Sequence, residues 1–231
     1  MKTFIRFLIP IVAIGVLALP VVIVAQSSGG FSFFFDSGVD GTAKLYAIFR
    51  IVGLEAFLLL TFQILLGSFR PFLERLYGAG KVLQFHTIAG PAIFVFVLSH
   101  PILYALYSGA VSGSIAEGFG KLMPSIPQTQ AEQYIALGRL ALYLLFLSVT
   151  AALLRRKLTK WNLWRKIHVL NYLIFFLIFF HSQNIGTDAP REPFHTISLF
   201  AAAGVVSGLL YRVIDRIRKT RAIALSPKSF L

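Results

Sequence analysis

Four of the five histidines occur as two pairs inside long apolar stretches. His86 and His100 are fourteen residues apart, and His168 and His181 are thirteen residues apart. An ionisable side chain inside a membrane segment is costly unless it faces a partner, so it is a functional candidate by default. Neutral imidazole is also a common metal ligand and can carry protons. The two pairs therefore indicate either a metal centre or a proton relay.

The absence of cysteine narrows the kinds of metal centre that the chain can build. Without thiols there is no disulfide, no thiolate zinc site, no iron–sulfur cluster and no covalently attached c-type haem. The two methionines are Met1 and Met123, and the second lies in a polar connection. Any metal centre must therefore rest on histidine, carboxylate or methionine, and histidine is the only good candidate.

The composition identifies an integral membrane protein. Of 231 residues, 57% are hydrophobic and only 13% are charged, with a mean hydropathy of +0.77. About 20 apolar residues span a bilayer. We therefore expect an all-α bundle of six transmembrane helices, forming one domain over residues 1–231. The expected spans are residues 4–25, 43–66, 85–107, 134–154, 167–183 and 194–214.

The first span has an alternative reading as a cleaved signal peptide, because a basic start and Ala25 resemble one. A retained helix is favoured, since the run is long enough to cross and Ile23 suits the cleavage motif poorly.

The basic residues set the expected orientation. Most of the 22 lysines and arginines fall at the N-terminus, after the second span, after the fourth span (the run at 155–157) and in the C-terminal tail. Most of the nine acidic residues fall in the other connections. By the positive-inside rule both termini are cytoplasmic, in a cell membrane that is most simply a prokaryotic inner membrane. The net charge of +13 then reflects membrane lipid rather than a nucleic-acid partner.

This topology makes the third and fifth spans parallel, which places His86 level with His168, near the inner surface, and His100 level with His181, near the outer surface. At a rise of about 1.5 Å per residue, the two levels are roughly 20 Å apart. Two facing imidazoles at one depth can ligate one haem iron from both sides. The arrangement therefore predicts two b-type haems, against the alternative that each histidine only makes helix–helix hydrogen bonds.

One geometric detail does not follow from the spacing. At about 100° per residue, fourteen residues return to nearly the same helix face, whereas thirteen do not. His168 and His181 should therefore point in different directions unless the fifth span is rotated or distorted.

At this point the chain resembles the ferric reductase-like transmembrane family, which includes NADPH oxidases, ferric reductases and the haem membrane subunit of bacterial methionine sulfoxide reductase. The resemblance covers roughly residues 40–220. It rests on H-x13-H in one span, H-x12-H two spans later, six helices and the lead-in W-x3-IH-x3-Y, which is Trp164, Ile167, His168 and Tyr172. It implies that His86 and His168 bind an inner haem and that His100 and His181 bind an outer one.

The resemblance also suggests roles for residues near the outer surface. Arg50 looks like an arginine that oxidase-type members carry near the outer haem. Tyr104 stands where oxidases tend to have a further histidine, which disfavours efficient superoxide production. Arg50 and Tyr104 are thus candidates for an outer acceptor site. Arg50 and Arg139 could pair with haem propionates, with snorkelling to the surface as the alternative.

Other polar residues carry weaker expectations. Lys81, Arg165 and Lys166 could neutralise inner propionates or dock an acidic donor, although topology alone explains them. Glu55 could serve a haem pocket or a proton, or be a buried neutral carboxyl. His195 is expected at the surface.

The expected function is that of an oxidoreductase component. Electrons would pass from a cytoplasmic reduced flavin or NAD(P)H donor through two haems to an outer acceptor, a ferric chelate or dioxygen. The chain has no G-x-G-x-x-G or P-loop run, so FAD or FMN and NAD(P)H would belong to a partner flavoprotein or to a missing domain. One alternative is a quinol-fed subunit serving a periplasmic reductase. Another is a transporter or proton channel without haem.

Overall fold

The computed structural model describes residues 2–154 and 161–225, which form nine helices and, within these ranges, no strand. The predicted all-α fold is therefore confirmed. Six helices are long: α1 (Lys2–Ser27), α3 (Gly41–Ser68), α5 (Lys81–Ser112), α7 (Gln130–Leu153), α8 (Trp161–Ile185) and α9 (Phe194–Leu225). Three are short: α2 (Ser32–Phe35), α4 (Arg70–Tyr77) and α6 (Ile115–Gly120). The basic run at 155–157 lies outside the described residues.

Five of the six predicted spans are confirmed as helices long and apolar enough to cross a membrane: α1, α3, α5, α7 and α9. This supports a multi-pass membrane protein. Helix α8 occupies the predicted fifth span and has 25 residues, but it does not reach the same hydropathy. Its polar side chains are the reason: His168, Asn171, His181, Gln183 and Asn184. The sixth crossing therefore stays a prediction.

Local sequence signals explain where the helices begin and end. The first amides of a helix have no partner within it, so a side-chain acceptor stabilises the start. Asp40 accepts from the amides of Thr42 and Ala43 at 2.9 and 3.1 Å, where α3 begins. Thr129 accepts from the amide of Glu132 at 3.2 Å, where α7 begins. These caps set the starting points of two helices that border the histidines.

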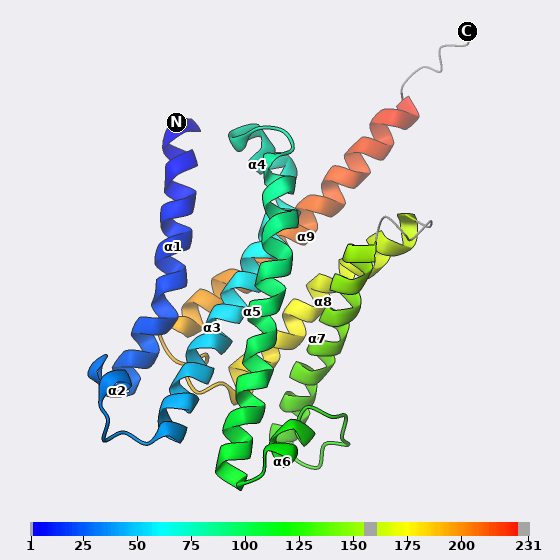
Figure 1. Cartoon of the computed structure of the whole chain (residues 1–231). Coiled ribbons are helices and arrows are strands. Elements are labelled where there is room, and N and C mark those ends of the chain that lie inside the picture. Colours follow the sequence, from blue (N-terminus) through cyan, green and yellow to red (C-terminus); the bar gives the residue numbers. More distant parts are fainter. Residues whose placement is uncertain (1, 155–160, 226–231) are drawn as a thin grey trace.

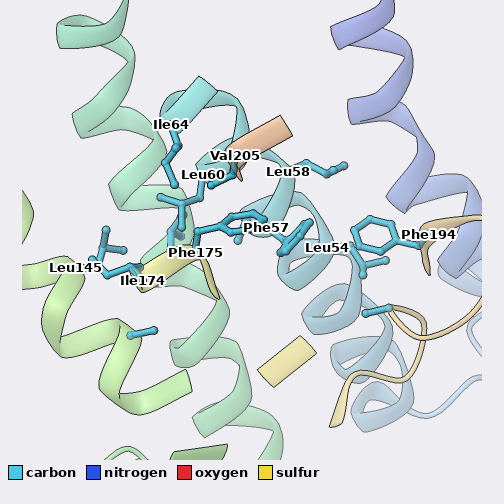
Figure 2. Packing of buried hydrophobic residues seen from close by; sticks show 14 of the residues in the cluster. Leu54, Phe57, Leu58, Leu60, Ile64, Leu145, Ile174, Phe175, Phe194 and Val205 are labelled. Atoms are coloured by element: carbon cyan, nitrogen blue, oxygen red, sulfur yellow. The ribbon is translucent and has the colours of Figure 1, made fainter. Parts of the chain in front are cut away.

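Helix α3 is the centre of the bundle. It packs against α1, α5, α8 and α9, and residues from several of its turns are buried. Figure 2 shows Phe57 of α3 beside Phe175 of α8 and near Phe194 of α9, with ring centroids 5.6 and 5.9 Å away. Helices in lipid gain little from removing apolar surface from water, so close packing of this kind is what holds them together.

The helices alternate in direction (Figure 1). Helices α1, α5 and α8 run one way, and α3, α7 and α9 run the other. Helices α5 and α8 are thus parallel, as the sequence predicts. The start of α1, helix α4 and the far end of α9 lie at one end of the bundle, while α2 and α6 lie at the other.

Candidate functional site

Helices α5 and α8 bring the first members of the two histidine pairs together. The ring centroids of His86 and His168 are 6.1 Å apart, and their planes are nearly perpendicular at 83°. Metal–nitrogen bonds of about 2.0–2.1 Å on each side, plus about 1.1 Å from nitrogen to ring centre, would give a separation of roughly 6.3 Å. The observed separation of the two ring centroids is thus close to the value for two imidazoles bound to one metal ion.

The second members of the pairs, His100 and His181, also lie on α5 and α8. Nδ1 of His181 lies 2.9 Å from the backbone carbonyl oxygen of Tyr134 on α7. Because a carbonyl oxygen only accepts, Nδ1 carries the proton and donates it. Nε2 of His181 then keeps its lone pair, which is the form that binds a metal.

His168 is held differently from His181. Its ring stacks on Trp164, one turn earlier in α8, with centroids 5.4 Å apart and an angle of 17°. The Asn171 amide lies 3.2 Å from its Nδ1 and donates to its backbone carbonyl at 2.8 Å. The Ser148 hydroxyl of α7 donates to the side-chain oxygen Oδ1 of Asn171 at 3.1 Å. The thirteen-residue spacing thus has an explanation, since His181 points toward α7 while His168 points toward His86.

Aromatic side chains surround His100. Phe49 of α3 stacks on the His100 ring at 4.7 Å and 12°. Phe49 also contacts Tyr104 and Tyr107 of α5, at 5.8 and 6.4 Å. Tyr104, a residue predicted for the outer acceptor site, is therefore separated from the His100 ring by one turn of α5 and lies against its Phe49 neighbour.

The two predicted arginines are engaged with other groups. Arg50 forms an ion pair with Asp188 in the α8–α9 connection, at 2.5 and 2.7 Å, and donates to Ser27 at the end of α1 at 2.5 Å. Arg139 donates to the carbonyl of Met123 at 2.6 Å and to Ser125 at 2.8 Å. Arg50 thus ties three segments together, and Arg139 anchors the loop between α6 and α7.

The weaker candidates divide between the surface and the interior. Lys81 and Lys166 are exposed near the His86–His168 level, and the side chain of Arg165 lies outside the described residues. Glu55 is half-buried on α3. His195 is not a free surface residue, because its Nδ1 donates to Gln183 of α8 at 2.8 Å. The sequence alone did not indicate that partner, since Gln183 and His195 belong to different helices.

The family comparison covers most of the helices just described. A family model for the ferric reductase like transmembrane component matches residues 52–179. The chain belongs to this family. The match contains His86, His100 and His168, while Arg50 and His181 lie two residues beyond its two ends. Searches of curated proteins and of solved structures find no match.

Membership of the ferric reductase-like family indicates an oxidoreductase component in the membrane. Within the described residues, no group of three or more His, Cys, Asp or Glu forms a cage for a bare metal ion. A haem iron needs only two axial ligands from the protein. The facing pair of His86 and His168, and the free Nε2 of His181, are donors of the right chemistry for that requirement.

Proposed function

We propose that this ferric reductase-like chain is a transmembrane b-type cytochrome that carries electrons between the two sides of the membrane through two haems. The supporting observation is the separation of 6.1 Å between the ring centroids of His86 and His168, which come from parallel helices. Each of these helices has a second histidine about four turns further along. One haem would be held by His86 and His168, and the other by His100 and His181.

The work of the protein in this proposal is to hold and separate the two centres. Fourteen residues of α5 place His86 and His100 about 21 Å apart along the helix axis. Haem supplies the one-electron chemistry. Ligation of each haem by two histidines would favour electron transfer over binding of a further ligand. Phe49, which stacks on His100, and its neighbours Tyr104 and Tyr107 would form an aromatic wall beside the outer haem.

The orientation that we propose follows from charge. Exposed cations such as Arg75, Lys81 and Arg218 belong to α4, the start of α5 and the later turns of α9, which lie at one end of the bundle. The positive-inside rule assigns this end to the cytoplasm. Helices α5 and α8 begin on this side, with His86 and His168 in their early turns and His100 and His181 further along. Electrons would enter there from a cytoplasmic reduced flavin or NAD(P)H-linked flavoprotein and leave to a ferric chelate or dioxygen outside.

Haem content tests the proposal directly. The full chain, purified from membranes supplied with haem, should be red and give about two haems b per chain in a pyridine haemochrome assay. His195→Ala is the matched control, because His195 bonds to Gln183 rather than to another histidine, and it should keep both haems. A colourless wild-type chain would refute the cytochrome and favour a transporter or proton channel.

The electron donor is tested separately. With NAD(P)H and a flavin reductase present, both haems should become reduced under anaerobic conditions. Reduction of the haems by a quinol analogue, with none by the flavin system, would contradict the flavin donor. It would favour the alternative of a quinol-fed subunit that delivers electrons to a periplasmic reductase.

A further inference from the structure

Three of the four paired histidines lie against a glycine on the neighbouring helix. A Cβ placed on Gly53 of α3 would lie 2.7 Å from Cε1 of His100, and one on Gly138 of α7 would lie 2.5 Å from Nδ1 of His181. A Cβ on Gly67 of α3 would lie 3.4 Å from Cε1 of His86. Real side chains essentially never approach within 3.0 Å in this way, so the first two positions admit no side chain unless the ring moves. We call Gly53, Gly67 and Gly138 the glycine notches.

The glycine notches on α3 follow the spacing of the histidines on α5. Gly53 and Gly67 are fourteen residues apart, as are His86 and His100. The two helices are antiparallel, so one register pairs Gly53 with His100 and Gly67 with His86. Gln63 agrees with that register, because its side-chain amide donates to the carbonyl of His86 at 2.7 Å.

Helices α7 and α8 are paired in a register of their own. Gly138 meets His181, and Ser148 bonds to Asn171, which fixes the same antiparallel alignment at two points. Continued by three residues, this alignment puts Ala151 opposite His168. Ala151 is buried, and it has a Cβ where the other three positions have none. His168 is the histidine that instead uses Trp164 and Asn171 as neighbours.

Gly138 also lies one helical turn after a carbonyl that accepts from Nδ1 of His181. The acceptor is Tyr134, four residues before Gly138, at 2.9 Å. At the corresponding positions before Gly53 and Gly67 stand Phe49 and Gln63. Nδ1 of His86 and Nδ1 of His100 are buried and make no hydrogen bond to the described residues.

A missing Cβ therefore does more than let two helices approach. It lets the imidazole lie against the neighbouring backbone, and at Gly138 it lets Nδ1 of His181 donate to the Tyr134 carbonyl of the preceding turn. A donor at Nδ1 fixes the tautomer of His181 and leaves its Nε2 lone pair free.

We propose that Gly53, Gly67 and Gly138 are positioning residues that set the orientation of the haem-ligating imidazoles of His100, His86 and His181, and that Gly138 thereby also sets the tautomer of His181. The proposal rests on the haem function above. Gly53 and Gly138 both act on the His100–His181 level, and their contacts are the tightest. Gly67 acts on the His86–His168 level, where the contact is looser.

The test uses full-length chain in detergent or nanodiscs. Gly53→Ala and Gly138→Ala should each shift the low-spin ferric g values and the reduction potential of one haem, or remove that haem. The same haem should be the one lost in His100→Ala, and the other haem should keep its wild-type values. Gly208→Ala is the matched control, because its Cβ would lie 2.7 Å from Cβ of Ser68, an equally tight contact without a histidine.

Two further variants keep the test decisive if Gly53→Ala and Gly138→Ala fail to fold. A Cβ on Gly67 would lie 3.4 Å from Cε1 of His86, and a Cβ on Gly204 would lie 3.5 Å from a methyl group of Leu65. Neither substitution therefore forces the helices apart. Only Gly67→Ala should shift the haem held by His86. Unchanged haem spectra in the notch variants, or equal shifts in the Gly208 and Gly204 controls, overturn the positioning role while the wild-type haem content stands. A wild-type chain without haem overturns both proposals.

Discussion

Arg50 and Asp188 form an ion pair that is almost completely shielded from solvent. The guanidinium and carboxylate approach to 2.5 Å, with side-chain exposures of 10% and 3%. Arg50 belongs to the central helix α3, and Asp188 belongs to the connection that leads from α8 into α9. A nearby hydrogen bond of 2.5 Å joins Tyr46 and Thr187 in the same two segments. The pair therefore fastens the α8–α9 connection to the centre of the bundle.

Removing one partner of this pair should be strongly destabilising. Asp188→Ala leaves the Arg50 guanidinium buried without its counter-ion, and such a loss costs about 3–5 kcal/mol. The double variant Arg50→Met with Asp188→Leu should recover much of that loss, because neither charge is then buried. Thermal unfolding of the purified chain, followed by circular dichroism, measures both effects. Equal stability of Asp188→Ala and wild type would show that Arg50 finds water or another acceptor.

The two histidine levels should lose haem independently. His100→Ala removes one ligand of the pair with His181, so we expect about one haem per chain, with the spectrum of the centre held by His86 and His168 retained. His86→Ala should give the complementary spectrum. The measurement is haem per protein together with a redox titration of what remains. Two haems retained in His100→Ala would contradict the assigned pairing.

Asn171 should tune the haem held by His168. Its amide lies 3.2 Å from Nδ1 of His168, and outer partners of metal-bound histidines typically change metal affinity by about 10–100-fold when removed. Asn171→Leu should therefore change the retention of that haem and lower its reduction potential, because the amide NH2 group is a donor that draws electron density from the imidazole. Haem per protein measures the retention, and a potentiometric titration measures the potential.

The control for Asn171 lies on the same helix. Asn184 donates to the carbonyl of Phe180 at 2.7 Å and is exposed, so Asn184→Leu makes the same chemical change away from the histidines. The Asn171 prediction is wrong if the two leucine variants behave alike.

The free energy of unfolding should fall in acid because the Glu74 carboxyl on α4 becomes protonated. The hydrogen bond from Arg70, at 2.9 Å, together with one from the amide of Gly80, lowers the pKa of Glu74 from its ordinary value of 4.5. A lowered folded-state pKa gives stability that is present above pH 4.5 and is lost as the pH drops through the folded value. Glu74→Gln should remove part of this acid dependence. The measurement is the melting temperature between pH 6 and pH 3.5, and the change should be small because the Arg70–Glu74 pair is partly exposed to solvent.

The sequence predicted the helices and the proximity of His86 to His168 because both depend on distances along one helix. Apolar length gave five spans directly, and the fixed rise per residue put His86 level with His168. The span around His168 and His181 is the exception, since the polar residues that make it interesting also reduce its hydropathy.

Features that depend on the register between helices could not be predicted from the sequence. Nothing in one sequence aligns Gly138 with His181, or brings Asp188 to Arg50, because these contacts depend on how α7 packs on α8 and how the last connection folds back. The signal that was present and overlooked is the fourteen-residue interval shared by Gly53 with Gly67 and by His86 with His100.

The shared fourteen-residue spacing of Gly53 with Gly67 on α3 and of His86 with His100 on α5 bears on the reduction potentials of the two proposed haems. Along that half of the bundle, His86 and His100 each lie against a glycine of α3. The other half has no such repeat, because His181 lies against Gly138 and the Tyr134 carbonyl whereas His168 has Trp164 and Asn171 as neighbours. With two haems held as proposed, a difference in reduction potential between the two centres would arise mainly from α7 and α8, together with the ring of Phe49 that stacks on His100.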